Sequence, residues 1–157
     1  MKILLLVIGK TSDEYLLDGI AKYVKRLKYY IGFEISEIPD IKNKNFSCNL
    51  KQKKLEAKLI LENIKHGDRL ILLDENGEQF DSINFSKFLQ KKMNSGIKRL
   101  VIVLGGAYGF DESLTAVYKE KISFSKMTFS HQMLRLFVVE QIYRSMTILK
   151  NEPYHHK

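Results

Sequence analysis

Glycines follow an apolar segment in the last third of the chain. Residues 100–104 are all aliphatic and lead directly into Gly105, Gly106 and Gly109. Parallel-sheet proteins bind small molecules where strands end and loops begin, and glycines at such an end let a ligand approach the backbone closely. The spacing differs from the G-x-G-x-x-G dinucleotide fingerprint and comes late in the chain. The segment therefore predicts one wall of a ligand pocket, although a tight turn into a capped helix would also explain it.

Two further strand ends carry residues suited to binding. The run 125–128 offers backbone donors and acceptors framed by Phe124, Met127 and Phe129, which suits a flat apolar heterocycle with polar edges. Leu73 and Asp74 end another apolar segment. If these three strands are neighbours, their carboxyl ends converge on one crevice. Either phenylalanine taken alone is more simply read as part of the core.

The chain closes with Pro153, Tyr154, His155 and His156. A Tyr–His pair offers acid–base groups that work near neutral pH. Adjacent histidines are more often incidental than metal ligands, and no other set of His, Cys and carboxylate residues has metal-ligand spacing. We therefore expect no metal.

The elements that would position these residues alternate between strand and helix. Hydrophobic periodicity predicts strands at 2–8, 33–38, 69–73, 100–104 and 122–125, and helices at about 12–28, 50–64, 82–94, 111–119 and 130–150. The polar stretch 40–49 is predicted to be a loop, and 75–78 a turn. The pattern is that of a mostly parallel α/β sheet with helices on both faces, in a single domain over residues 1–157.

Charge and composition narrow the class of partner. The chain has 26 Lys and Arg against 18 Asp and Glu, a net charge of +8, with lysines concentrated in 22–28 and 51–58. A basic balance of this size indicates nucleic acid about as often as a merely lysine-rich protein. The single cysteine, Cys48, excludes an intramolecular disulfide framework and fits a reducing compartment. No apolar run reaches transmembrane length, so we expect a cytoplasmic protein without membrane contact.

The final predicted helix is apolar on nearly every side of its helical wheel. Such a helix must be buried on several sides, and one sheet in so small a domain cannot cover it. A homodimer built around this helix is the simplest explanation. Its polar residues form two i,i+4 pairs on opposite sides, His131 with Arg135 and Glu140 with Arg144. Polar groups buried there must be paired or meet a ligand.

Taken together, the chain resembles the RlmH family of SPOUT-type rRNA methyltransferases over essentially its whole length. The segments that carry the resemblance are 7–10, 37–40, 104–106, 123–132, 140–144 and 153–155. The resemblance implies a SPOUT α/β fold with a C-terminal trefoil knot, which general topology rules would have argued against. It also implies a homodimer that binds S-adenosylmethionine and methylates N3 of pseudouridine 1915 in 23S rRNA of the assembled ribosome.

The resemblance also assigns residues. Cofactor contacts fall on Leu73, Gly105, Phe124, Ser125, Lys126, Met127, Thr128 and Phe129. Functional residues of the last helix and tail fall on Arg144, Tyr154 and His155. His156 is a departure that leaves open which imidazole faces the substrate. We expect the pocket and the tail of one active site to come from different protomers, so that a monomer is inactive.

Two other classes of protein compete with this one. A flavodoxin-like phospho-receiver would use Asp74 and Lys126, but it also needs acidic residues after the first strand, where Gly9 and Lys10 stand. A nicotinamide-dependent oxidoreductase needs the glycine fingerprint after that same strand, and the fingerprint is missing there.

Overall fold

The structure is a computed structural model that describes residues 1–41 and 49–156. The predicted loop 40–49 and Cys48 fall largely or wholly outside the described residues.

The described strands form one parallel sheet. They are β1 (Lys2–Ile8), β2 (Gly32–Ile38), β3 (Arg69–Gln79), β4 (Arg99–Leu104) and β5 (Lys121–Ser123). Their order across the sheet is β2-β1-β4-β3-β5, and every neighbouring pair is parallel. The predicted parallel α/β class is confirmed, and the three strands that were expected to converge, β4, β3 and β5, are adjacent.

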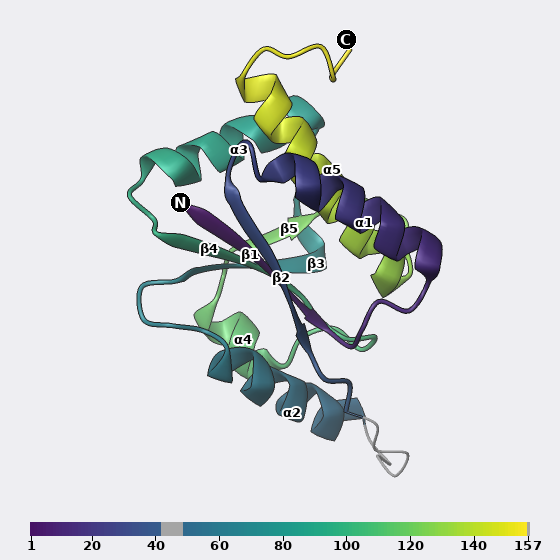
Figure 1. Ribbon diagram of the computed structural model, residues 1–157. Coiled ribbons are helices and arrows are strands. Elements are labelled where there is room, and N and C mark those ends of the chain that lie inside the picture. Colours follow the sequence, from purple (N-terminus) through teal and green to yellow (C-terminus); the bar gives the residue numbers. More distant parts are fainter. Residues whose placement is uncertain (42–48, 157) are drawn as a thin grey trace.

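Helices cover both faces of this sheet (Figure 1). One layer contains α1 (Glu14–Leu27), α3 (Ser82–Asn94) and α5 (His131–Leu149), and the opposite layer contains α2 (Asn49–Glu62) and α4 (Glu112–Val117). Within the first layer α5 packs against both α1 and α3. The C-terminal tail extends beyond the far end of α5.

Alternation along the strands divides the core into two clusters. In β1, Ile3, Leu5 and Val7 pack toward the α1, α3 and α5 layer, whereas Leu4, Leu6 and Ile8 pack toward α2 and α4. Because both faces are covered, the strand is apolar at every position from 3 to 8.

Side-chain caps begin three of the helices near the positions that the sequence predicts. Asp81 accepts a hydrogen bond from the amide of Asn84 at the start of α3 (2.6 Å), and Asp111 accepts one from Ser113 at the start of α4 (3.0 Å). Ser130 accepts one from the amide of Met133 at the start of α5 (3.2 Å). Each cap satisfies an amide that the helix itself leaves free.

One predicted boundary is wrong. The sequence predicts that β3 ends at Leu73 and that 75–78 is a turn, but β3 continues to Gln79. Leu73 and Glu78 both pair with Ile122 of β5, so the intervening residues leave the ladder and return to it. The Asn76–Gly77 pair has turn chemistry, and it forms a bulge within the strand instead of ending it.

Candidate functional site

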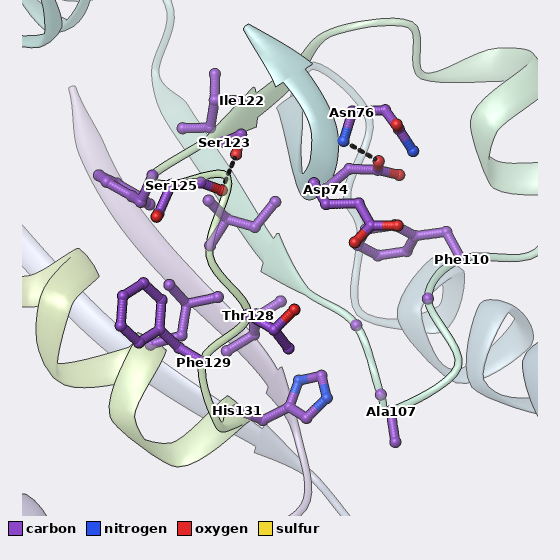
Figure 2. Close-up of a pocket in the computed structure, with 18 of the residues that line it drawn as sticks. Asp74, Asn76, Ala107, Phe110, Ile122, Ser123, Ser125, Thr128, Phe129 and His131 are labelled. Atoms are coloured by element: carbon purple, nitrogen blue, oxygen red, sulfur yellow. Dashed lines mark hydrogen bonds between the residues drawn. The ribbon is translucent and has the colours of Figure 1, made fainter. Parts of the chain in front are cut away.

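A cavity of about 460 Å³ opens at the carboxyl ends of β3, β4 and β5. Its walls are the β3 bulge, the glycine loop after β4, the loop after β5 and the first turn of α5 (Figure 2). All eight residues predicted to contact a cofactor line it: Leu73, Gly105, Phe124, Ser125, Lys126, Met127, Thr128 and Phe129. The volume lies within the range of small-molecule sites.

Gly105 and Gly106 lie close to protein side chains, which gives a reason for these glycines besides the predicted approach of a ligand. A Cβ on Gly105 would meet the Phe110 ring at 3.0 Å, and a Cβ on Gly106 would meet the Glu56 carboxylate at 2.5 Å. These two glycines therefore make room for neighbouring protein side chains. Gly109 has φ of +74°, a left-handed conformation that closes the turn before α4.

The loop after β5 is held by its own serines and by two aromatic contacts. Ser123 donates a hydrogen bond to the carbonyl of Ser125 (2.9 Å), whose hydroxyl accepts one from the Met127 amide (2.8 Å). Phe124 packs edge-on against Phe85 with 5.4 Å between ring centroids, and Phe129 packs edge-on against Phe137 at 5.0 Å. Phe124 therefore packs against the core and lines the cavity at once, whereas Phe129 lines the cavity and packs against α5.

Asp74 is tied into the β3 bulge. It accepts hydrogen bonds from the Asn76 amide (3.0 Å) and the Lys121 ammonium (3.1 Å). Burial alone would raise the pKa of this carboxyl, but the two hydrogen bonds and the lysine charge outweigh it, so the pKa is lowered. Asp74 pairs with Lys121 and not with Lys126. The Asp74–Lys126 pair that a phospho-receiver would use is therefore not formed.

Several lining residues were not predicted, and His131 is the most informative of them. Its ring lies between Thr128 and the glycine loop at Ala107 (Figure 2). Burial and the charge of Arg135 lower its pKa, although Glu56 and the Gly105 backbone oppose the shift. Within the described part of the chain its Nδ1 is buried and has no hydrogen-bond partner. Its i,i+4 spacing with Arg135 was the signal in the sequence.

Arg135 anchors this end of α5 to the sheet. Its guanidinium is buried and donates hydrogen bonds to the carbonyl of Ile8 (2.7 Å) and the hydroxyl of Thr11 (2.8 Å). Glu37, at the end of β2, lies 3.9 Å away. Of the predicted His131–Arg135 pair, His131 thus lines the cavity, whereas Arg135 is buried in the protein interior.

The predicted functional residues of the tail lie at the other end of α5. Arg144 follows His131 by 13 residues, which corresponds to about 20 Å along a helix. Tyr154 folds back onto α5 and α1: its hydroxyl lies 3.1 Å from Oε1 of Glu140 and 3.2 Å from the hydroxyl of Tyr23. Within one chain the structure therefore does not bring Arg144 and Tyr154 to the cavity.

We call Tyr23, Glu140, Tyr143, Arg144 and Tyr154 the tail cluster. Arg144 forms the predicted ion pair with Glu140 (2.5 Å), and its guanidinium lies 4.7 Å from the centroid of the Tyr154 ring. Burial and the hydrogen bonds to Tyr23 and Glu140 raise the pKa of Tyr154 above its ordinary value. The phenol therefore stays protonated near neutral pH and acts as a hydrogen-bond donor.

Two other kinds of feature are absent from the residues that the structure describes. No group of three or more His, Cys, Asp or Glu side chains among them is placed to hold a metal ion. No helix there has the length and apolar character needed to span a bilayer.

An open parallel sheet with a ligand-sized cavity at adjacent strand ends defines an α/β small-molecule-binding domain. The family model described as "Predicted SPOUT methyltransferase" matches residues 1–155. The chain therefore belongs to the SPOUT methyltransferase family.

Curated relatives cover the whole chain. Proteins named ribosomal RNA large subunit methyltransferase H are 55% identical in Parabacteroides distasonis and 54% identical in Flavobacterium johnsoniae, each over 157 residues and 100% of both chains. Among solved structures, a methylase family protein from Haemophilus influenzae matches with a TM-score of 0.52 and 10% identity, covering 99% of this chain and 70% of that one. The structural likeness supports the fold alone.

Proposed function

We propose that this protein transfers a methyl group from S-adenosylmethionine to N3 of a pseudouridine in large-subunit ribosomal RNA, the position 1915 that the resemblance implies. The observation that carries the proposal is the cavity at three adjacent strand ends, lined by every residue that the resemblance assigns to the cofactor. Relatives about 55% identical over the full chain are named ribosomal RNA large subunit methyltransferase H, which supports methyl transfer to large-subunit rRNA.

The cavity fits the cofactor in size and chemistry. Apolar walls from Leu73, Phe124 and Phe129 suit the adenine ring, and the backbone of the loop after β5 supplies polar edges. The buried, unpaired Nδ1 of His131 within the described chain offers one hydrogen-bonding atom to a polar ligand. When bound, S-adenosylmethionine supplies an electrophilic methyl group on a sulfonium centre.

The protein must do two things for transfer to N3 of the base. It must hold the ring nitrogen in line with the methyl group, since positioning alone supplies much of the rate. It must also favour loss of the N3 proton, because the anion is the better nucleophile. Arg144 would stabilise the developing negative charge, and His155 would accept the proton. Burial and the hydrogen bonds to Tyr23 and Glu140 raise the pKa of Tyr154, which disfavours its phenol as the base relative to His155.

The composite site follows from the length of α5. Because about 20 Å of helix separates His131 from Arg144, one chain cannot place its own tail cluster at its own cavity. A second copy packed against α5 would bring its tail cluster to this cavity. The homodimer is therefore part of the proposal.

RNA would be held largely through phosphates. Lys51, Lys54 and Lys58 of α2 are exposed, and Lys53 of the same helix lines the cavity. Lysines beside the pocket place positive charge where an RNA strand entering it would run.

Nucleoside mass spectrometry tests the proposal. Ribosomal RNA from a strain lacking the gene should contain no N3-methylpseudouridine, and expression of the protein should restore it. Purified protein should bind S-adenosylmethionine in calorimetry and transfer a labelled methyl group to ribosomes from the deletion strain. Unchanged N3-methylpseudouridine in the deletion strain would rule the activity out.

A further inference from the structure

Glu140 is the shared acceptor of the tail cluster. Its Oε1 accepts hydrogen bonds from Arg144 Nε (3.0 Å), Arg144 Nη2 (2.5 Å) and the Tyr154 hydroxyl (3.1 Å). Arg144 lies one turn away on α5, whereas Tyr154 comes 14 residues later in the tail. One carboxylate oxygen thus joins the helix to the folded-back tail.

The other carboxylate oxygen fixes Glu140 itself. Oε2 accepts a hydrogen bond from the side-chain NH₂ group of Gln141 (2.8 Å). The side-chain oxygen Oε1 of Gln141 in turn accepts a hydrogen bond from the Ser82 hydroxyl (3.0 Å). Ser82 is the first residue of α3. The orientation of Glu140 is therefore also supported from a neighbouring helix.

The surroundings of this carboxylate are not those of an ordinary surface ion pair. The side chains of Arg144 and Glu140 are 25% and 16% exposed, so the pair is partly shielded from solvent. An exposed i,i+4 pair contributes little to stability. Here the pair also holds Tyr154, whose ring packs edge-on against Tyr143 with 4.8 Å between centroids. Without the carboxylate, the guanidinium is free to turn and the phenol keeps Tyr23 alone as its hydroxyl partner.

We propose that Glu140 is the positioning residue of the active site, holding the Arg144 guanidinium and the Tyr154 hydroxyl in one arrangement toward the RNA base. This inference rests on the proposed function, in which Arg144 and Tyr154 face the substrate. Glu140 acts through these two groups. Glu140 accepts hydrogen bonds from Nε and Nη2 of Arg144. Among the described residues, Nη1 of Arg144 therefore remains able to donate a hydrogen bond to the substrate.

The test is a Glu140→Gln variant, which keeps the size of the side chain and removes its charge. Methyl transfer to ribosomes should fall about 10- to 100-fold in kcat at saturating ribosome, because misplaced groups lose rate steeply. The Kd for S-adenosylmethionine should change less than about threefold, since the cavity is built from other residues. Glu34→Gln, which breaks an exposed ion pair with Lys2 at the sheet edge, is the matched control and should keep its activity.

A second measurement separates positioning from general destabilisation. Backbone amides of Glu152 and of residues 154–156 should exchange hydrogen faster in Glu140→Gln than in the unmodified protein, while amides of β1 and β4 exchange at unchanged rates. Wild-type kcat at a temperature well below the melting point of the variant, or unchanged exchange in the tail, would overturn the proposal. If the unmodified protein methylates no ribosome, the proposed function fails, and the exchange experiment still decides whether Glu140 holds the tail.

Discussion

Gly77 of β3 lies directly against the backbone of Ile122 in β5. A Cβ atom on Gly77 would stand 2.6 Å from the nitrogen and 2.7 Å from the Cα of Ile122, closer than real Cβ atoms approach a backbone. β3 therefore leaves the ladder after Leu73 and pairs with β5 again at Glu78, and the lack of a side chain at Gly77 allows the close contact with the β5 backbone. The bulge between the two pairings forms one wall of the cavity.

Replacing Gly77 by alanine should destabilise the fold more than any cavity substitution of similar size. The added methyl group meets backbone atoms that cannot turn aside, so we expect the free energy of unfolding in urea to fall by about 3 kcal/mol. Gly32→Ala is the matched control, because a Cβ there would come no closer than 3.5 Å to any neighbour, the flexible Lys2 side chain, which is ordinary van der Waals contact. Equal stability of the two variants would contradict the close contact between Gly77 and the Ile122 backbone.

Gly106 and Glu56 offer a test of the glycine loop. Gly106→Ala should weaken S-adenosylmethionine binding at least about tenfold in calorimetry, because the new methyl group collides with the Glu56 carboxylate and displaces the loop. Shortening the neighbour in Gly106→Ala/Glu56→Ala should restore most of the affinity. The double variant with Glu56→Gln, which keeps the size, should restore none. Equal recovery by both would mean that charge and not space is the cause.

The sequence predicted the strand ends well because local chemistry determines them. Apolar runs, glycines and caps mark where β4 and α5 begin or end, and the predicted bounds of α3 agree with the structure. The β3 bulge was missed because Asn76–Gly77 is a turn signal on its own. What makes it a bulge is the contact with Ile122, 45 residues further along the chain.

Tertiary contacts also explain what was missed at the site. Glu56 lies in a lysine-rich helix that reads as a solvated surface, yet its side chain is buried against Gly106. Its burial depends on α2 packing beside the glycine loop, which no local pattern encodes. The Glu140–Arg144 pair, by contrast, was predicted, because i,i+4 spacing on a helix determines the contact. The knot and the homodimer remain predictions.

His131 should make the stability of the protein depend on pH below neutrality. Its pKa is lowered by burial and by Arg135, so in the acid range the unfolded chain binds a proton that the folded chain resists. The stabilisation is complete above the unfolded pKa of about 6.5 and is lost as the pH falls from there through the lower, folded pKa. The free energy of unfolding in urea, measured from neutral pH down into the acid range, should depend less steeply on pH in His131→Asn than in the unmodified protein.

A control variant and a direct titration check the role of His131. His66→Asn, on an exposed turn, is the control and should keep the pH dependence of the unmodified protein. The His131 ring should titrate below about 6.5 by NMR. A ring that titrates above that value would contradict the burial that the structure assigns to it.

Lysines of α2 should contribute to ribosome binding by pairing with phosphates. Replacing Lys51, Lys54 and Lys58 by glutamine should weaken binding and reduce the slope of log K against log salt by about 0.7 to 0.9 for each phosphate that is no longer neutralised. The same change at Lys87 and Lys91, exposed on α3 in the opposite layer, is the control and removes two charges instead of three. An equal decrease per charge removed from the two helices would mean that net charge, and not the face beside the cavity, governs binding.

Mixed dimers test whether one active site draws on two chains. Arg144→Ala removes the guanidinium of the tail cluster and leaves the cavity intact, whereas Gly106→Asp drives a carboxylate against Glu56, displaces the glycine loop that walls the cavity and leaves the tail intact. Each variant alone should be inactive. In a heterodimer, the open cavity of the first chain meets the intact tail of the second, so one of its two sites is whole. Random mixing of equal amounts should therefore restore about a quarter of the unmodified activity, measured as methyl transfer to deletion-strain ribosomes. If each site were built within one chain, every dimer would lack a complete site, and mixing would restore nothing.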